Sequence, residues 1–286
     1  MDIKNKKVGV IGTGLMATGI VQLCGMKGYD VRMLARSEQS RDRAMNVITG
    51  ELDRLVSKDK MSGEDRGAVL KRVKPTLEMS DLSDSDIIIE SIIEDLKIKQ
   101  DLFSRLDTVC PNVRIAATDT AGLPVTRIAE ATKKPERIIG IHLLSPVVLS
   151  KALELIRPAS CSDEVFKLSK EFCETLGKKV LVVKDSPGFI VNRLLTPFVL
   201  SAVRLMEEGT ATKEDIDAAM RLGTGHPVGP IELLDLAGLK NYCDLADNLY
   251  KMLNDKSYIV PDSMRELVKQ GNLGRKTGKG FYDWKK

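Results

Sequence analysis

The sequence of 286 residues predicts an α/β domain followed by an all-helical domain. Short β-branched runs alternate with helical stretches up to about Lys184, and no run of comparable quality follows. The runs occupy residues 8–11, 31–34, 87–89, 115–117, 138–141, 153–156 and 180–183. They are continuous rather than alternating in polarity, which suits strands buried on both faces of a parallel sheet. Helices above and below such a sheet complete the α/β arrangement.

The change of rhythm near residue 185 divides the chain into expected domains of residues 1–185 and 186–286. Ser186-Pro187 offers an N-cap and a first-turn proline for a long helix, and Gly209 offers its end. Pro197 inside this helix predicts a kink, because its ring removes one backbone donor and clashes with the preceding turn. The second domain is therefore expected to be helical.

Charge and composition argue against several functional classes. The 44 Lys and Arg residues are interleaved with 40 Asp and Glu residues, so nucleic-acid binding is not indicated. No window reaches the roughly 18 apolar residues of a spanning helix. Met1 to Lys7 are polar rather than signal-like, so we expect a cytoplasmic protein without a membrane segment. The five cysteines form no Cys-x-x-Cys pair, which predicts reduced thiols and neither disulfides nor a metal site.

The segment Gly12-Thr13-Gly14-Leu15-Met16-Ala17 carries a dinucleotide-binding pattern. It follows the first predicted strand directly and opens a helix, which makes it stronger than the same spacing elsewhere. Gly12 permits a tight turn, Gly14 lets the backbone approach a pyrophosphate, and Ala17 keeps the helix close to the strand. The first amides of the helix, at Leu15 and Met16, would face the phosphates. The first domain is therefore predicted to be a Rossmann domain.

The expected end of the second strand favours NADP over NAD. An NAD site usually has Asp or Glu there for the ribose hydroxyls, but this chain has Ala35. Arg36 can pair with a 2′-phosphate and Ser37 can donate a hydrogen bond to it, with Arg41 one helical turn later. The alternative is that Arg36 is a solvated surface charge and that Glu38 binds the ribose of NAD.

His142 and Glu154 form a candidate acid/base pair. His142 ends the apolar run 138–141, at the carboxyl edge of a predicted strand, where α/β sheets bind their ligands. Glu154 lies inside the next apolar run, where a carboxylate is costly unless it is paired. If the two strands are neighbours, Glu154 can hold one imidazole nitrogen while the other exchanges a proton. The alternative is a buried histidine bonded to the backbone.

The sequence resembles the short-chain 3-hydroxyacyl-CoA dehydrogenase (3-hydroxybutyryl-CoA dehydrogenase) family over essentially its whole length. The supporting segments are residues 12–20, 89–99, 140–142, 151–156, 186–193, 225–230 and 273–282. The resemblance implies an oxidoreductase of fatty acid metabolism with an N-terminal Rossmann domain. It also implies a helical C-terminal domain that forms the homodimer, and an active site in the cleft between the domains.

The same resemblance implies roles for individual residues. His142 would be the catalytic acid/base and Glu154 its orienting partner. Asn192 would hydrogen-bond the substrate oxygen. Glu94 and Lys99 match positions that line the cofactor.

The departures from the family pattern surround one expected substrate pocket. The family's Ser-Asn-Thr-Ser-Ser is Thr118-Asp119-Thr120-Ala121-Gly122 here, so Ala121 stands at the position of the catalytic serine. The family's His-Phe-Phe-Asn-Pro is His142-Leu143-Leu144-Ser145-Pro146, and the usual methionine before the lysine is Ser150. Loss of one preorganised donor typically costs about 10²- to 10³-fold in rate. With His142 and Glu154 retained, these changes indicate a retuned substrate.

Three functions are compatible with this pattern. The first is an NADP-dependent oxidoreductase that transfers a hydride between nicotinamide and the C3 position of a 3-hydroxyacyl-CoA thioester or related β-hydroxy substrate. The second is an imine reductase on the same fold, because an iminium carries its own charge and depends less on the missing serine donor. The third is a dinucleotide-binding protein without catalysis.

Overall fold

The computed structural model describes residues 7–284, and the chain divides into two compact units, residues 1–185 and 186–286. We predicted from the polar segment Met1 to Lys7 that the chain has no signal peptide. Of this segment only Lys7 lies within the described residues. The α/β fold of the first unit and the helical fold of the second are both confirmed.

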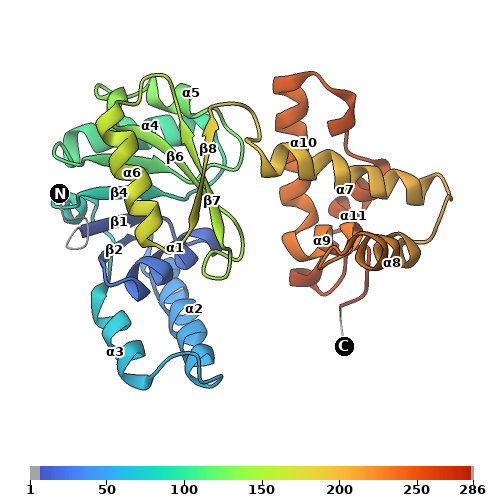
Figure 1. The fold of residues 1–286 in the computed structure, drawn as a ribbon, viewed down its shortest axis with the longest axis horizontal. Coiled ribbons are helices and arrows are strands. Elements are labelled where there is room, and N and C mark those ends of the chain that lie inside the picture. Colours follow the sequence, from blue (N-terminus) through green and yellow to red (C-terminus); the bar gives the residue numbers. More distant parts are fainter. Residues whose placement is uncertain (1–6, 285–286) are drawn as a thin grey trace. The chain divides into compact units, whose positions relative to one another are not determined.

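Within the described residues of the first unit, eight strands form one sheet in the order β3-β2-β1-β4-β5-β6-β7-β8 (Figure 1). Neighbouring strands are parallel except β6 and β7, which are antiparallel. The strands are β1 (Lys7–Ile11), β2 (Asp30–Leu34), β3 (Val73–Thr76), β4 (Ile87–Glu90), β5 (Ile115–Thr118), β6 (Ile138–Leu143), β7 (Ala152–Arg157) and β8 (Lys179–Lys184). The central strands β4, β5 and β6 are buried along their whole length, as their apolar runs predict.

Helices connect these strands and cover the sheet. They are α1 (Leu15–Met26), α2 (Glu38–Val56), α3 (Gly63–Arg72), α4 (Leu96–Val109), α5 (Val125–Ala129) and α6 (Asp163–Thr175). Figure 1 shows α2 and α3, in blue and cyan, as a helical pair that extends beyond the sheet. Side chains of β1, α1 and α6 share one core with the apolar face of α2, including Val10, Ile20, Ile48 and Phe172.

Strand β3 is absent from the sequence-based expectation. Its four residues Val-Lys-Pro-Thr show neither an apolar run nor alternation, and Pro75 lacks a backbone donor. The strand nevertheless pairs with β2, with Pro75 opposite Met33. It lies at the edge of the sheet, where a proline is tolerated because one side of the strand needs no ladder bonds.

The second unit contains α7 (Val191–Glu207), α8 (Lys213–Thr224), α9 (Pro230–Ala237), α10 (Leu239–Leu253) and α11 (Asp262–Lys269). Their apolar faces share a core that includes Leu200, Val203, Leu234, Ala246 and Met264. In the part of the chain that the structure describes, none of the helices combines the length and apolarity needed to cross a bilayer.

The start of α7 differs from the prediction. Ser186-Pro187 does not cap the helix, because the chain first makes a turn in which Phe189 N donates to Ser186 O at 3.1 Å. Gly188 and Phe189 both have positive φ, 72° and 52°, which is incompatible with a helix, and α7 begins at Val191. The end is as expected: the helix stops at Glu207, and Gly209 follows with a φ of 71°.

Helix α7 continues through Pro197. A proline leaves the carbonyl four residues earlier without its helical donor. Here that carbonyl belongs to Arg193, and the Tyr258 hydroxyl donates to it at 2.8 Å. The lost helical bond is therefore replaced by a bond from outside the helix.

Candidate active site

The carboxyl ends of β1, β4 and β5 meet at one edge of the sheet. The ladder continues one residue past each strand, because Ser91 N donates to Ile11 O at 2.9 Å and Asp119 N donates to Glu90 O at 2.8 Å. This edge is where open α/β sheets bind their ligands. The loops that follow these strands carry four of the residues expected to form the site, Gly12, Gly14, Glu94 and Ala121.

The glycine-rich turn has the shape that a dinucleotide requires. Gly12 has a φ of 129°, and a Cβ atom there would collide with the Ser91 carbonyl oxygen. Gly14 is the N-cap of α1, and a Cβ atom added to it would meet nothing within 4 Å. No side chain caps this helix, its first turn contains no acidic residue, and Leu15 at its start is 77% exposed. The positive end of α1 therefore faces open space, which fits a pyrophosphate.

The end of β2 lacks a carboxylate directly after the strand. Ala35 is buried and its N–H donates to Thr76 O at 2.9 Å, whereas Arg36 is exposed. Ser37 is the N-cap of α2 and forms a capping box with Ser40. Arg41 already lies 2.8 Å from an Asp42 carboxylate oxygen, and this contact raises the pKa of the guanidinium. Arg36 is therefore the most available of the three residues expected to contact a 2′-phosphate.

His142 and Glu154 lie directly opposite each other in the antiparallel register of β6 and β7. His142 Nδ1 and Glu154 Oε2 are 2.7 Å apart. Glu154 is fully buried and His142 is 7% exposed, so the carboxylate is held at fixed geometry next to the imidazole. This contact supports the paired arrangement over a histidine bonded only to the backbone.

Lys99 is buried in an ion-pair network under the loop after β4. Its Nζ donates to Glu90 Oε1 and lies 3.5 Å from Glu94 Oε2. Glu90 also accepts from Thr118 Oγ1 at 2.8 Å and from Ile92 N at 2.8 Å. Lys99 is fully buried, so its ammonium group contacts these carboxylates and not solvent.

Glu94 anchors the loop that contains Ala121. Its Oε1 accepts from Thr120 Oγ1 at 2.5 Å, from Ala121 N at 2.9 Å and from Gly122 N at 3.2 Å. The hydroxyls of Thr118 and Thr120 thus donate to Glu90 and Glu94, respectively. Neither is available to take the place of a serine hydroxyl at position 121.

The expected pocket residues at the end of β6 and in the loop after it differ in burial. Leu143 is buried in the apolar core, whereas Leu144 is half-buried and Ser145 is exposed. Half-buried Ser150 donates from Oγ to Ala152 O at 2.9 Å at the end of the loop. The structure therefore leaves Leu144 and Ser145 closer to solvent than Leu143.

Buried Lys178 holds the same loop through the loop's backbone carbonyl groups. Lys178 Nζ donates to Val147 O at 2.7 Å, to Val148 O at 3.2 Å and to Ser150 O. Burial lowers the pKa of this ammonium, and Lys27 lowers it further. Three carbonyl partners compensate the burial of the charge.

The remaining expected catalytic residue belongs to the second unit. Asn192 is half-buried in the first turn of α7. His226 lies in the segment after α8, where its N–H donates to Met220 O and its ring packs against Phe198 at 5.3 Å. This arrangement supports a structural role for His226.

Asp119 is a further candidate functional residue. Its buried carboxyl group was not predicted from the sequence. Its carboxyl accepts from Leu143 N at 2.9 Å and from Ser91 Oγ at 3.0 Å, and it is 9% exposed. Burial raises the pKa of Asp119 to about 7, although the neighbouring His142 opposes the rise. The available signal was the replacement of the family's asparagine by aspartate at the carboxyl end of a strand.

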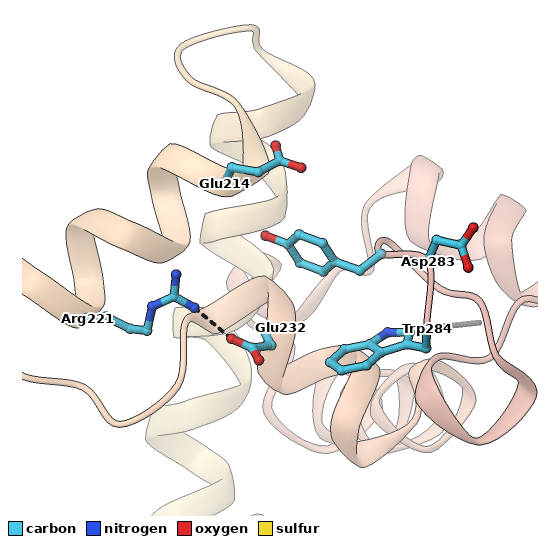
Figure 2. Close-up of a pocket in the computed structure, with 6 residues that line it drawn as sticks. Glu214, Arg221, Glu232, Asp283 and Trp284 are labelled. Atoms are coloured by element: carbon cyan, nitrogen blue, oxygen red, sulfur yellow. Dashed lines mark hydrogen bonds and ion pairs between the residues drawn. The ribbon is translucent and has the colours of Figure 1, made fainter. Parts of the chain in front are cut away.

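The second unit contains a pocket of ≈280 Å³ lined by Glu214, Arg221, Glu232, Tyr282, Asp283 and Trp284 (Figure 2). Several of its polar groups already have partners. Arg221 pairs with Glu232 at 2.8 Å, as the dashed line in Figure 2 shows, and the Trp284 indole donates to Asp235 at 2.9 Å. This pocket contains no pair comparable to His142 and Glu154, so we place the candidate active site at the sheet edge.

Two family models cover the chain. The 3-hydroxyacyl-CoA dehydrogenase NAD binding domain matches residues 7–186, and the C-terminal domain of the same family matches residues 188–284. A 3-hydroxybutyryl-CoA dehydrogenase from Bradyrhizobium diazoefficiens is 41% identical over 98% of this chain and 96% of the relative. The mitochondrial hydroxyacyl-coenzyme A dehydrogenase of Mus musculus is 40% identical over 98% of this chain and 91% of the relative.

Solved structures agree with these matches. FadB2 of M. tuberculosis superimposes with a TM-score of 0.95 at 35% identity, over 98% of this chain and 99% of that one. The (S)-3-hydroxybutyryl-CoA dehydrogenase PaaH1 from Ralstonia eutropha gives a TM-score of 0.91 at 36% identity, over 99% of this chain and 100% of that one. The chain therefore belongs to the 3-hydroxyacyl-CoA dehydrogenase family and is a nicotinamide-dinucleotide-dependent oxidoreductase acting on CH–OH groups.

Proposed function

We propose that the enzyme interconverts a 3-oxoacyl and a 3-hydroxyacyl thioester with NADP(H), in a pocket retuned relative to the family. The observation that carries the proposal is the buried His142–Glu154 pair, 2.7 Å apart, on the sheet whose edge also holds the dinucleotide turn. The names of the relatives support a CoA thioester as the substrate class. The family's homodimer and a cytoplasmic location are part of the proposal.

The residues divide the work between binding and proton transfer. The α1 N-terminus behind Gly14 would hold the pyrophosphate of the dinucleotide, whose nicotinamide would supply or accept the hydride. Glu154 orients the imidazole through Nδ1, so that His142 Nε2 exchanges a proton with the substrate oxygen. The family resemblance adds Asn192 as the residue that would donate a hydrogen bond to the substrate oxygen. Glu94 holds the loop that contains Ala121 in a fixed conformation.

The preference for NADP rests on the end of β2. Ala35 removes the carboxylate that would repel a 2′-phosphate, and exposed Arg36 supplies a cation for it. Ser37 and Arg41 contribute less, because both already have partners on α2. The alternative in which Glu38 binds the ribose of NAD predicts the opposite preference.

Asp119 favours imine reduction as a second candidate. A buried carboxyl near the acid/base histidine, next to a loop that has lost its serine donor, suits a cationic iminium better than a developing oxyanion. The carboxyl replaces the neutral amide that the family has there. A ketone supplied together with ammonia or a small amine would then be reduced to an amine.

One assay separates the candidates. Purified enzyme is given 3-oxobutyryl-CoA with NADPH or NADH, and in parallel a ketone with ammonia and NADPH. Thioester reduction that disappears in His142→Ala, while NADPH binding is retained, supports the proposal. Amine formation without thioester reduction supports the imine reductase. Tight NADPH binding with neither reaction overturns both and favours a protein without catalysis.

A further inference from the structure

The acid/base pair lies close to the end of the ladder between β6 and β7. His142 is opposite Glu154, and the next pair, Leu143 opposite Leu153, is the last one in the register. Residues 144–151 then form the loop that joins the two strands. The geometry of the acid/base pair therefore depends on how firmly this loop keeps the two strand ends together.

A single buried ammonium holds the loop. Lys178 is 6% exposed. Its Nζ donates to the backbone carbonyl oxygens of Val147 at 2.7 Å, of Val148 at 3.2 Å and of Ser150. An ammonium has three N–H donors and no acceptor, so these three carbonyls match its full donor capacity. A neutral side chain at this position would leave the carbonyls without that donor.

The backbone around Lys178 fixes where the ammonium lies. Gly177 has a φ of 76°, in the left-handed region that favours glycine, and it turns the chain from α6 into β8. Directly after Lys178, Lys179 N donates to Lys151 O at 2.8 Å, at the last residue of the loop. The start of β8 thus holds the loop through a backbone bond as well as through the ammonium.

The loop also packs against the predicted dinucleotide helix. Val147 is buried, and a Cβ atom added to Gly19 of α1 would lie 2.8 Å from the Val147 Cβ. Val147 therefore meets α1 with its side chain and Lys178 with its carbonyl oxygen. The loop is held from two sides at this residue.

We propose that Lys178 is a positioning residue that keeps His142 and Glu154 in reacting geometry through the loop between their strands. The inference rests on the proposed function of this pair in proton transfer. Without the ammonium, the loop is freer to move and the end of the ladder opens, so the imidazole loses its fixed carboxylate. A misplacement of about 1 Å at a reacting group can cost about 10²-fold in rate.

The first test follows the loop without using activity. Lys178→Met keeps a long apolar side chain and removes the three donors. In the full-length protein, hydrogen–deuterium exchange read by mass spectrometry should become about 10-fold faster or more in residues 144–151 and in both strand ends, residues 138–143 and 152–157. Exchange in β1 and β2 should stay unchanged. No increase, an increase confined to the loop, or one spread evenly over the sheet would overturn the proposal.

Lys27→Met is the matched control. Lys27 is exposed just after α1, and its Nζ would lie 3.0 Å from a Cβ atom added to Gly177, so its charge is close to Lys178. This charge lowers the pKa of Lys178, and its removal favours the ammonium form that holds the loop. Exchange should therefore remain as in the wild type. Equal increases in Lys27→Met and Lys178→Met would show that surface charge stabilises the loop and would overturn the proposal.

Kinetics separate positioning from folding. With 3-oxobutyryl-CoA and NADPH, Lys178→Met should lower kcat by roughly 10- to 100-fold and leave the KM for NADPH unchanged. Lys178→Arg keeps a charged group with several donors and should restore most of the rate. A wild-type kcat in Lys178→Met, together with faster exchange, would show that the ammonium serves folding alone and would overturn the proposal. If exchange rises at the loop and both strand ends but the wild type reduces no thioester, the positioning role is supported and the proposed function is overturned.

Discussion

Glu154 faces His142 across the only antiparallel junction of the described sheet, with Oε2 2.7 Å from Nδ1. If β7 ran parallel to β6, the pairing register would change and Glu154 would no longer lie directly opposite His142. Both residues are buried, so the pair needs its mutual contact to offset the loss of hydration. The reversal of β7 thus has a specific effect on the site: it places a carboxylate behind the acid/base histidine.

Glu154→Gln tests this relationship. An amide can still contact Nδ1, but it does not stabilise the imidazolium and can select the wrong tautomer. We expect kcat to fall by about 10²-fold or more, within the range known for general acid/base catalysis, while the KM for NADPH changes little. Glu174→Gln, at an exposed carboxylate on α6, is the matched control. A rate equal to wild type would show that Glu154 only fills the core.

Ala121→Ser tests the missing donor. Ala121 N donates to Glu94, so the loop already has a fixed conformation into which a hydroxyl can be added. If the substrate is a 3-oxoacyl thioester, the added donor should raise kcat/KM by about 10-fold or more. Ala121→Cys, of similar size but a weak donor, is the control. A decrease specific to the serine variant would mean that the pocket accepts a substrate for which this hydroxyl is unfavourable.

Much of this arrangement could be predicted from sequence because it depends on local patterns. Continuous apolar runs identify buried strands, and the spacing from Gly12 to Ala17 identifies the dinucleotide turn. The pairing of His142 with Glu154 could be stated only as a condition, because adjacency of two strands is a property of the whole sheet. The predicted start of α7 was wrong, because nothing in the sequence signals the positive φ of Phe189, which is not a glycine.

The environment of Asp119 could not be predicted at all. Its burial and its raised pKa arise from three strands that meet only in the folded chain. Lys99 illustrates the same limit, because its helix position is readable but its contact with Glu90 is not. The contacts of buried charged residues such as Asp119 and Lys99 are therefore the part of the site that is hardest to predict from sequence.

Asp119 also makes stability depend on pH. Its pKa rises from 3.8 in an exposed chain to about 7 in the fold, so the folded state binds more protons between these values. The contribution of protonated Asp119 is complete below pH 3.8 and is lost as the pH rises through about 7. We expect the urea midpoint of the wild type to fall between pH 5.5 and 8 by more than that of Asp119→Asn. Equal pH dependence in the two proteins would contradict the shift.

Arg36→Ala tests the cofactor preference. A hydrogen bond to a charged group contributes about 1.5–3 kcal/mol, which corresponds to roughly 10- to 150-fold in affinity. We expect kcat/KM for NADPH to fall within this range and that for NADH to stay unchanged. Arg43→Ala, which alters an exposed arginine on α2, is the control. Equal losses for both cofactors, or a wild-type preference for NADH, would leave Glu38 as the ribose-binding residue.

Asp235→Asn tests what holds the C-terminal segment. Asp235 is almost fully buried, and its two oxygens accept from Phe281 N at 2.9 Å, Tyr282 N at 2.8 Å and the Trp284 indole at 2.9 Å. An amide has only one acceptor oxygen, so at least one of these donors must face an NH₂ group. An unsatisfied buried donor costs about 1–3 kcal/mol, whereas an exposed ion pair contributes about 0–1 kcal/mol.

The matched control is Asp244→Asn, which alters an exposed carboxylate paired with Lys240 on α10. We expect Asp235→Asn to lower the thermal midpoint by several degrees and Asp244→Asn to leave it nearly unchanged. Gly280→Ala should resemble Asp235→Asn, because a Cβ atom at Gly280 would collide with the same carboxylate. If both tail variants melt like the wild type, the three bonds to Asp235 contribute little, and the tail is held by apolar packing of Phe281 against the core of the second unit.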